Sequence, residues 1–275
     1  MIDLQRLFDV RGFTAVITGG TGVLGSEMAL ALARAGVRVA ILSRHATSSA
    51  QVVQAIQAEH GEAIGITCDV LRRTDLEYAC AEVLKSFGTV DILINAAGGN
   101  SPQATTSANV SFFDLDVGAI ESVLALNFTG TFQSCQVFGR AMVDRGQGSI
   151  VNVASMNALR PLTRIPAYSA AKAAVANFTQ WLAVHMAQEY RAHIRVNAVA
   201  PGFILTEQNR FLLTDAQSGA MTPRGQAILN HTPMARFGAP QDLIGTLLWL
   251  VSPASAFVTG IVIPVDGGFS AFSGV

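Results

Sequence analysis

Seven short runs of mainly apolar, often β-branched residues alternate with longer helix-like segments along this chain. The runs are TAVIT (14–18), VRVAIL (37–42), AIGIT (63–67), DILIN (91–95), GSIVNV (148–153), IRVNAVA (194–200) and GIVIPV (260–265). Runs that are apolar along their whole length are typical of parallel strands buried on both faces, and each parallel connection needs a crossover, usually a helix. The pattern predicts an α/β fold, a doubly wound parallel sheet of about seven strands with helices on both faces.

Length and charge limit the kinds of partner. A chain of 275 residues can form one α/β domain, which we expect to span 1–275. The net charge is −1 and no basic run is present, so the sequence lacks the electrostatic footprint of a nucleic-acid or anionic-membrane partner. The longest apolar run, around 247–251, is too short to cross a bilayer. We expect a small-molecule substrate, no nucleic acid and no membrane partner.

Composition bears on assembly and location. Charged residues make up only 13% of the chain and hydrophobic residues 50%, which suggests that an oligomer buries part of the surface. The first residues lack the basic segment and long apolar core of a secretory signal. Cys68, Cys80 and Cys135 are odd in number and lack metal-ligand spacing, which indicates reduced thiols in the cytoplasm and no metal site.

Two irregular segments interrupt the alternation. The first, GGNSPQATTSANVSFFD (98–114), follows the fourth predicted strand. Ligands of open α/β sheets bind beyond the carboxyl ends of the strands, so this segment is expected near a binding site. The second segment, at about 206–232, is longer than an ordinary connection and mixes apolar with polar residues. We interpret the second segment as a substrate lid.

A glycine-rich turn, TGGTGVLG (18–25), joins the first strand to a helix-like segment. Glycines there let backbone N–H groups and a helix amino terminus approach a pyrophosphate. Turns use glycine for other reasons too, but the position between the first strand and the first helix favours a dinucleotide site.

The second strand ends in Ser43 and Arg44, and no acidic residue occurs from 28 to 58. A carboxylate at this place binds the ribose hydroxyls of NAD, whereas an arginine accommodates the 2′-phosphate of NADP. Arg44 could also be a solvated strand end. The sequence favours NADP, with NAD possible because Ser43 does not repel it.

Tyr168 precedes Lys172 by four residues in PAYSAAK (166–172), in a chain with three tyrosines and two lysines. On a helix this spacing places both side chains on one face. The pair could be a tyrosine packed on a lysine stem at the surface. Alternatively, the ammonium could favour the phenolate of Tyr168, a proton donor and acceptor whose free pKa is near 10.

The glycine turn, NAAG (95–98), Asn127 in LALNFTG, Ser155 thirteen residues before Tyr168, PGFILT (201–206) and VDGG (265–268) occur in the order of a known family. With these motifs the chain resembles the short-chain dehydrogenases/reductases over nearly its whole length. The resemblance implies a single-domain Rossmann-type fold and a homotetramer built through helices near 117–144 and 167–190. It also implies hydride transfer between nicotinamide and a carbonyl or alcohol substrate.

The resemblance assigns roles to individual residues. Tyr168 would donate the proton, Ser155 would hydrogen-bond the substrate oxygen, Lys172 would bind the nicotinamide ribose, and Asn127 would hold a water of the proton path. Each has a structural alternative, because Ser155 could end a strand and Asn127 could satisfy helix backbone. The cofactor-binding set comprises Gly19, Thr21, Gly22, Val23, Leu24, Gly25, Ser43, Arg44, Asp69, Val70, Asn95, Ala96, Ala97, Gly98, Tyr168, Lys172, Pro201, Gly202, Ile204 and Thr206.

Three members of that set carry alternatives of their own. Asp69 could cap the next helix, and Asn95 could be a loop-forming residue at a strand end. Val23 stands where the family usually has the middle glycine, which gives TGxxGxxG, the spacing of the nucleotide-sugar epimerase branch. An epimerase would want a larger carboxyl-terminal domain than the residues after Pro201 supply.

The segment between Ser155 and Tyr168 and the start of the lid carry amide and guanidinium groups. The predicted substrate-binding residues are Ser155, Asn157, Arg160, Arg164, Gln208, Asn209 and Arg210. Arginine pairs with carboxylate and amides bind hydroxyls, which suits a polyhydroxylated carboxylate. The chain is similar here to family members that act on D-mannonate and fructuronate. The alternatives are a 3-oxoacyl thioester reductase, a nucleotide-sugar epimerase and a nucleotide-sensing protein without catalysis.

Overall fold

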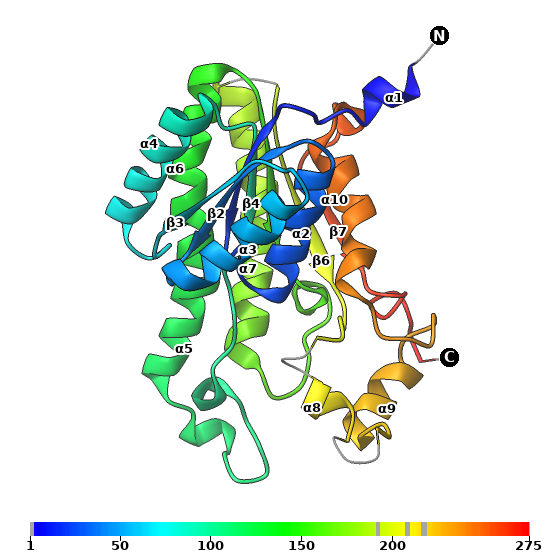
Figure 1. Cartoon of the computed structure of the whole chain (residues 1–275). Helices are drawn as coiled ribbons and strands as arrows, with labels where there is room; N and C mark the ends of the chain where they lie inside the picture. The colour runs from blue at the N-terminus through cyan, green and yellow to red at the C-terminus, as the bar shows by residue number, and fades with distance from the viewer. Residues whose placement is uncertain (1–2, 191–192, 207–209, 216–218, 275) are drawn as a thin grey trace.

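The computed structural model describes residues 3–190, 193–206, 210–215 and 219–274. Its central feature is a sheet of seven parallel strands in the order β3-β2-β1-β4-β5-β6-β7 (Figure 1). The strands are β1 (Thr14–Thr18), β2 (Arg38–Ser43), β3 (Ala63–Thr67), β4 (Ile92–Asn95), β5 (Gly148–Val153), β6 (Ile194–Pro201) and β7 (Val262–Val265). Each lies in a run that the sequence predicts to be a strand, so the doubly wound α/β prediction is confirmed.

Helices cover both faces of this sheet. They are α1 (Leu4–Leu7), α2 (Val23–Arg34), α3 (Ala46–Ala58), α4 (Arg73–Phe87), α5 (Val117–Leu124), α6 (Gly130–Arg145), α7 (Pro166–His185), α8 (Arg210–Leu213), α9 (Pro223–Asn230) and α10 (Ile244–Val251). In Figure 1, α2, α3 and α10 lie on one face, and α4, α6 and α7 lie on the other. Two π-helical turns, η3 (Ala125–Thr129) and η5 (Met186–Tyr190), interrupt the long helices.

The alternation of side chains along each strand produces two hydrophobic cores. In β1, Val16 packs on the α4–α6–α7 face with Leu42, Phe138 and Leu182. Its neighbours Ala15 and Ile17 point to the other face, which contains Met28, Leu32 and Leu247 among other residues. Successive side chains of a strand point to opposite faces, so apolar residues are needed at every position of a sheet covered on both sides. This requirement explains the uninterrupted apolar runs in the sequence.

Local signals fix where the helices begin and end. Pro166 is the first residue of α7, where the missing N–H costs nothing. Asp116 accepts a hydrogen bond from the Ala119 N–H at the start of α5. Helices α4 and α6 end at Gly88 and Gly146, which adopt the left-handed conformation that glycine tolerates.

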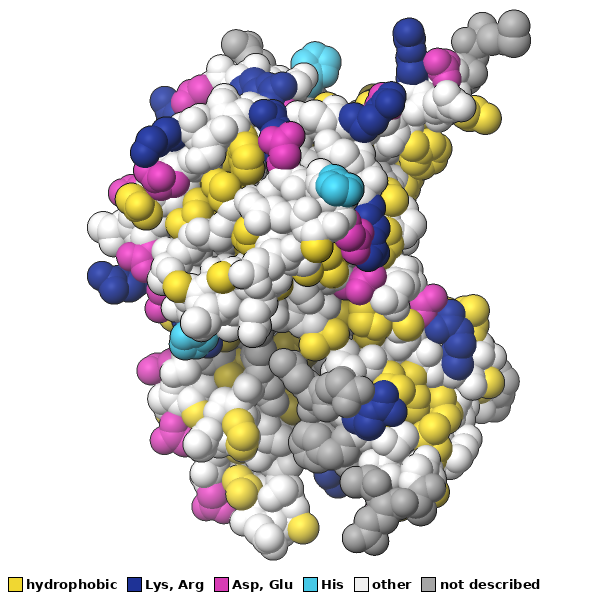
Figure 2. All heavy atoms as spheres, in the orientation of Figure 1, with side chains coloured by type: hydrophobic (Ala, Val, Ile, Leu, Met, Phe, Trp, Pro, Cys, Tyr) yellow, Lys and Arg dark blue, Asp and Glu magenta, His cyan; other side chains and the backbone are white. Residues whose placement is uncertain are grey.

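The irregular segments lie at the carboxyl end of the sheet. Figure 1 shows α5 and the 98–116 segment at the lower left and α8 with α9 at the lower right. The space-filling view shows an indentation between these two regions at the lower edge (Figure 2). On the same face, Lys and Arg side chains are interspersed with Asp and Glu side chains. No helix within the described residues is both long and apolar enough to span a bilayer.

Candidate active site

Ser155, Tyr168 and Lys172 come together at the carboxyl end of β5. Ser155 follows this strand directly, and Tyr168 and Lys172 lie one turn apart on α7. All three line a cavity of about 370 Å³, here called the catalytic cavity. The other lining residues come from the glycine turn, the end of β4 and the segment after β6: Gly19, Gly22, Val23, Leu24, Gly25, Ala96, Gly98, Gly99, Val153, Ala154, Pro201, Gly202, Phe203, Ile204 and Thr206.

The Ser155 hydroxyl is held by Asn157. Its Oγ accepts hydrogen bonds from the backbone N–H of Asn157 (3.2 Å) and from Asn157 Nδ2 (3.4 Å). Asn157 Oδ1 in turn accepts from the Leu162 N–H (3.1 Å) and the Ser169 hydroxyl (3.4 Å). Asn157 is buried, so the prediction that it contacts substrate gives way to a role in orienting Ser155.

Burial raises the pKa of Tyr168 above the usual value of a phenol, while a hydrogen bond with the Ser155 side chain lowers it. Removal of a phenolate from water disfavours the charged form. The group is therefore protonated at neutral pH in this structure, which is the form that can donate a proton to a carbonyl oxygen.

Lys172 is almost completely buried. Its Nζ donates a 2.7 Å hydrogen bond to the Val153 carbonyl oxygen and lies 5.6 Å from the centroid of the Tyr168 ring. Burial lowers the pKa of Lys172 from 10.5 to about 8. The sequence suggested that this ammonium lowers the Tyr168 pKa. In the structure burial outweighs any such effect, because the ammonium bonds a backbone carbonyl.

Asn127 lies in the π-helical turn η3, a type of irregularity that is frequent at functional sites. Its Nδ2 donates to the carbonyl oxygens of Gly99 (2.7 Å) and Val123 (2.8 Å), and its Oδ1 accepts from the Gly99 N–H (3.2 Å). A Cβ on Gly98 would stand 2.6 Å from Asn127 Oδ1 and 3.2 Å from Lys172 Nζ. The NAAG glycine thus permits the close approach of both polar side chains.

The glycine turn forms one wall of the catalytic cavity. Gly19 has a φ of +64°, and a Cβ there would lie 2.7 Å from Ala97. A Cβ on Gly25 would lie 2.3 Å from the Gly19 carbonyl oxygen, so the turn closes only with glycine at this position. Gly22 precedes the first residue of α2, Val23, so the cavity reaches a helix amino terminus of the kind that binds phosphates. The turn fits the pyrophosphate of a dinucleotide despite Val23.

A second cavity of about 210 Å³, here called the adenosine cavity, adjoins the same turn. It is lined by Gly19, Thr21, Gly22, Leu42, Ser43, Arg44, His45, Cys68, Val70, Ala96, Ala97, Gly98 and Leu126. Ser43 Oγ donates to the His45 carbonyl oxygen (2.8 Å) and accepts from the His45 N–H (3.3 Å). None of these lining residues carries a carboxylate, so Arg44 and His45 are the polar groups that can reach a ribose or its phosphate.

Two predicted cofactor residues do not line either cavity. Asp69 Oδ1 accepts from the Leu71 N–H (3.0 Å) and holds the turn before α4, as the capping alternative suggests. Asn95 is buried beneath the sheet edge, where its amide donates to Asn152 Oδ1 (2.8 Å) and to the Cys135 sulfur (3.2 Å). Its neighbours Ala96 to Gly98 approach the cavities instead, because successive residues at a strand end face opposite sides.

The predicted substrate-binding arginines have different surroundings. Arg160 Nε donates to the Ser270 carbonyl oxygen (3.2 Å), which ties the segment after Ser155 to the end of the chain. Arg164 is exposed and has a φ of +75°, and its carbonyl oxygen accepts from the Thr106 N–H (2.8 Å). Arg210 begins α8, whereas Gln208 and Asn209 lie outside the described residues. None of the three arginines lines the catalytic cavity.

Several lining residues were not predicted from the sequence. Phe203 and Gly99 line the catalytic cavity, and His45 and Leu126 line the adenosine cavity. Phe203 and Gly99 are adjacent to recognised motifs, so extending each motif by one residue would have included them. Leu126 lies on η3, far from the glycine turn in sequence, and only the tertiary structure brings it there.

The cysteines take no part in this site. All three are free and buried. Burial raises the pKa of Cys68 and of Cys135 to about 12, so their thiols are protonated and unreactive at neutral pH. Among the described residues, no group of histidine, cysteine and acidic side chains is arranged to hold a metal ion.

Comparisons with known proteins agree with this geometry. Residues 13–217 match the family model described as short chain dehydrogenase. An uncharacterized oxidoreductase, UxuB, from Bacillus subtilis (strain 168) is 51% identical, over 100% of each chain. The crystal structure of a "putative D-Mannonate oxidoreductase" from Haemophilus influenza with bound NAD is 43% identical, has a TM-score of 0.92 and is matched over 97% of this chain and 98% of that chain.

A further solved structure is a gluconate 5-dehydrogenase from Burkholderia cenocepacia J2315 in complex with NADP and tartrate. It is 29% identical, with a TM-score of 0.87 over 98% of this chain and 100% of that chain. The family model covers most of the chain, and these likenesses extend over almost all of it. The chain therefore belongs to the short-chain dehydrogenase/reductase family, whose members are NAD(P)-dependent oxidoreductases acting on alcohol and keto groups.

Proposed function

We propose that this oxidoreductase interconverts the keto group of a small keto-uronate and the hydroxyl group of the corresponding aldonate, as in fructuronate and D-mannonate. The observation that carries the proposal is the nearly full-length likeness, at 43% identity, to the protein described as a D-mannonate oxidoreductase. The likeness to a gluconate 5-dehydrogenase complexed with tartrate, a small hydroxylated dicarboxylate, supports the same substrate class.

The proposed roles follow from the geometry of the catalytic cavity. A bound nicotinamide supplies or accepts the hydride. The Ser155 hydroxyl, oriented by Asn157, donates a hydrogen bond to the substrate carbonyl oxygen. Tyr168, protonated because burial raises its pKa, gives its proton to that oxygen during reduction and takes it back during oxidation. Lys172 is held by the Val153 carbonyl oxygen one turn away, where its charge stabilises the phenolate that Tyr168 leaves behind.

For the cofactor we propose NADP, with NAD also used. Arg44 lines the adenosine cavity, and none of the described lining residues of that cavity carries a carboxylate that would repel a 2′-phosphate. The Ser43 hydroxyl is occupied by bonds within its own turn, so it offers NAD little in return. The relative with bound NAD shows that a chain 43% identical to this one accepts the unphosphorylated dinucleotide, which supports dual use.

For the substrate carboxylate we propose Arg164 and Arg210, which come from the segment after Ser155 and from the start of the lid. Arg164 is exposed, and among the described residues its guanidinium makes no ion pair. Gln208 and Asn209 of the proposed lid would bind hydroxyl groups. Arg160 would contribute through the end of the chain that it holds at Ser270.

A substrate panel tests the proposal. Reduction of fructuronate and tagaturonate should exceed reduction of acetoacetyl thioesters in kcat/KM, and Arg164→Ala should raise KM for the keto-uronates. Loss of one charged hydrogen bond costs about 1.5–3 kcal/mol, or roughly a tenfold to hundredfold rise in KM. Faster reduction of the thioester would favour a 3-oxoacyl thioester reductase instead. Epimerisation of a nucleotide-sugar without net redox change would favour the epimerase alternative.

We also propose a cytoplasmic homotetramer assembled through α6 and α7. Trp181 and Val184 are more than half exposed on α7, an unusual position for large apolar side chains. Trp181 stacks between Phe178 and His185, and these three side chains line a groove with α6. An apolar groove of this kind fits a second copy of the chain. The three buried free thiols suit a reducing compartment.

A further inference from the structure

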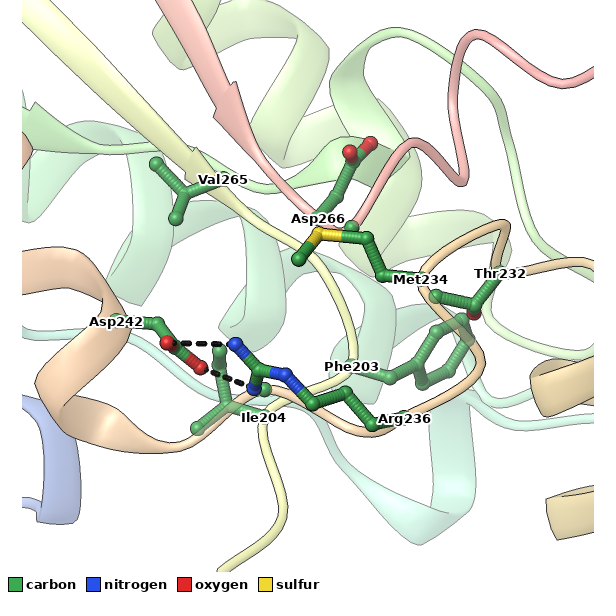
Figure 3. Close-up of a pocket in the computed structure, with 10 residues that line it drawn as sticks. Phe203, Ile204, Thr232, Met234, Arg236, Asp242, Val265 and Asp266 are labelled. Atoms are coloured by element: carbon green, nitrogen blue, oxygen red, sulfur yellow. Dashed lines mark hydrogen bonds and ion pairs between the residues drawn. The ribbon is translucent and has the colours of Figure 1, made fainter.

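The segment Pro201–Thr206 is a wall between two cavities. Phe203 and Ile204 line the catalytic cavity on one side. The same two residues line a cavity of about 180 Å³ on the other side, together with Arg236, Gly238 and Asp242 (Figure 3). A wall with space behind it needs support from elsewhere to keep its position, because packing alone does not fix it.

Backbone hydrogen bonds to Gly238 provide that support. The Gly238 N–H donates to the Phe203 carbonyl oxygen (2.9 Å), and the Leu205 N–H donates to the Gly238 carbonyl oxygen (2.8 Å). Together they form an isolated parallel bridge between Ile204 and Gly238. A Cβ on Gly238 would lie 2.5 Å from Ile204 Cδ1, so the two backbones approach closely because residue 238 is glycine. The position of the wall is therefore tied to the position of Gly238.

An ion pair closes the chain around Gly238. Arg236 donates to both carboxylate oxygens of Asp242, at 2.6 and 2.9 Å, and Figure 3 shows the two side chains lying edge to edge. Asp242 also accepts from the Ala239 N–H (2.8 Å), and Arg236 donates to the Phe237 carbonyl oxygen (3.1 Å). These contacts hold the two residues on either side of Gly238 as well as the ends of the turn. Bidentate pairing of this type fixes orientation as well as distance.

We propose that the Arg236–Asp242 ion pair positions the Pro201–Thr206 segment against the nicotinamide end of the cofactor. The inference rests on the proposed cofactor role of that segment. The segment lines the cavity that contains Tyr168 and Lys172 but not the cavity that contains Arg44. Loss of the pair should weaken binding of the whole dinucleotide while leaving binding of its adenosine-diphosphate part unchanged. Arg236 and Asp242 are thus positioning residues that do not touch the cofactor.

Direct binding measurements test the inference without relying on turnover. Asp242→Asn and Arg236→Met should raise the dissociation constants of NADH and NADPH about fivefold, as expected for a weakened charged hydrogen bond. The dissociation constant of ADP-ribose, which lacks nicotinamide, should stay within about twofold of the wild-type value. Arg236→Lys keeps the charge but not the bidentate geometry, so it should weaken dinucleotide binding to an intermediate extent.

A matched control separates positioning from a general loss of stability. Arg34 and Glu59 form another bidentate pair, with contacts of 2.6 and 2.7 Å and side chains 54% and 44% exposed, against 50% and 33% for Arg236 and Asp242. Glu59→Gln should leave the binding of both ligands unchanged, and its Tm should match that of Asp242→Asn. Unchanged NADH and NADPH binding in Asp242→Asn and Arg236→Met, or equal weakening of ADP-ribose, would overturn the inference. Failure of the wild type to bind any dinucleotide would refute the proposed cofactor site itself.

Discussion

Lys172→Met should make the protein more stable while removing its activity. Lys172 is only 5% exposed, and among the described residues no carboxylate is paired with it. Burial lowers its pKa from 10.5 to about 8. Each tenfold change in proton affinity corresponds to ~1.4 kcal/mol, so the buried charge costs ~3 kcal/mol at neutral pH. Loss of the bond to the Val153 carbonyl oxygen offsets about 1 kcal/mol of the gain.

The expected net gain is therefore ~2 kcal/mol at pH 7, or about 5 °C in Tm for a domain of this size. The sign follows from linkage. Below pH 8 Lys172 is charged in both the folded and unfolded states and its full cost applies. Between pH 8 and 10.5 the unfolded chain binds more protons than the folded protein, so wild-type stability rises relative to Lys172→Met. The stability gap between the two proteins should close over this window.

Calorimetry at fixed protein concentration between pH 7 and 10 measures the gap, because every other group titrates alike in the two proteins. The chain offers one matched control, since Lys85 is its only other lysine and lies exposed beside Glu82. Lys85→Met should change Tm little at any pH. A lower Tm for Lys172→Met than for wild type at pH 7, or a gap that does not depend on pH, would refute the argument. A stabilised but inactive variant would show that the site retains a destabilising charge for function.

Three further predictions concern the catalytic cavity, the cofactor and the assembly. Tyr168→Phe should keep its fold and cofactor affinity but lose about 10²- to 10⁴-fold in kcat, the usual share of general acid catalysis, and near-normal turnover in a steady-state assay would contradict the assigned role. Arg44→Ala should raise KM for NADPH roughly tenfold or more while changing KM for NADH little, and an equal loss with both cofactors would show that Arg44 does not read the 2′-phosphate. Trp181→Glu should shift the molecular mass measured by light scattering from tetramer towards smaller species, and a wild type that is monomeric at micromolar concentration would rule out the proposed assembly.

The amino-acid sequence by itself determined the strands and the order of the chemical groups. A sheet covered on both faces needs apolar residues at every strand position, so each of the seven runs was visible without any knowledge of its neighbours. Gly19 and Gly25 were recognisable because no other residue type fits their backbone. The spacing of Tyr168 and Lys172 placed them on one face of a helix, and that helix is α7. All of these are local properties, encoded within one element or one turn.

Only the tertiary structure decided what the polar side chains between these elements contact. Arg160 donates to the Ser270 carbonyl oxygen, 110 residues away, so its guanidinium cannot be assigned from the loop in which it lies. Asn95 turns away from the cavities towards Asn152, and Asn157 turns towards Ser155. The pKa values of Tyr168 and Lys172 depend on how deeply α7 is buried, which their spacing does not encode. Hydrogen bonds and desolvation depend on groups brought together from distant parts of the chain, whereas apolar periodicity and backbone conformation do not.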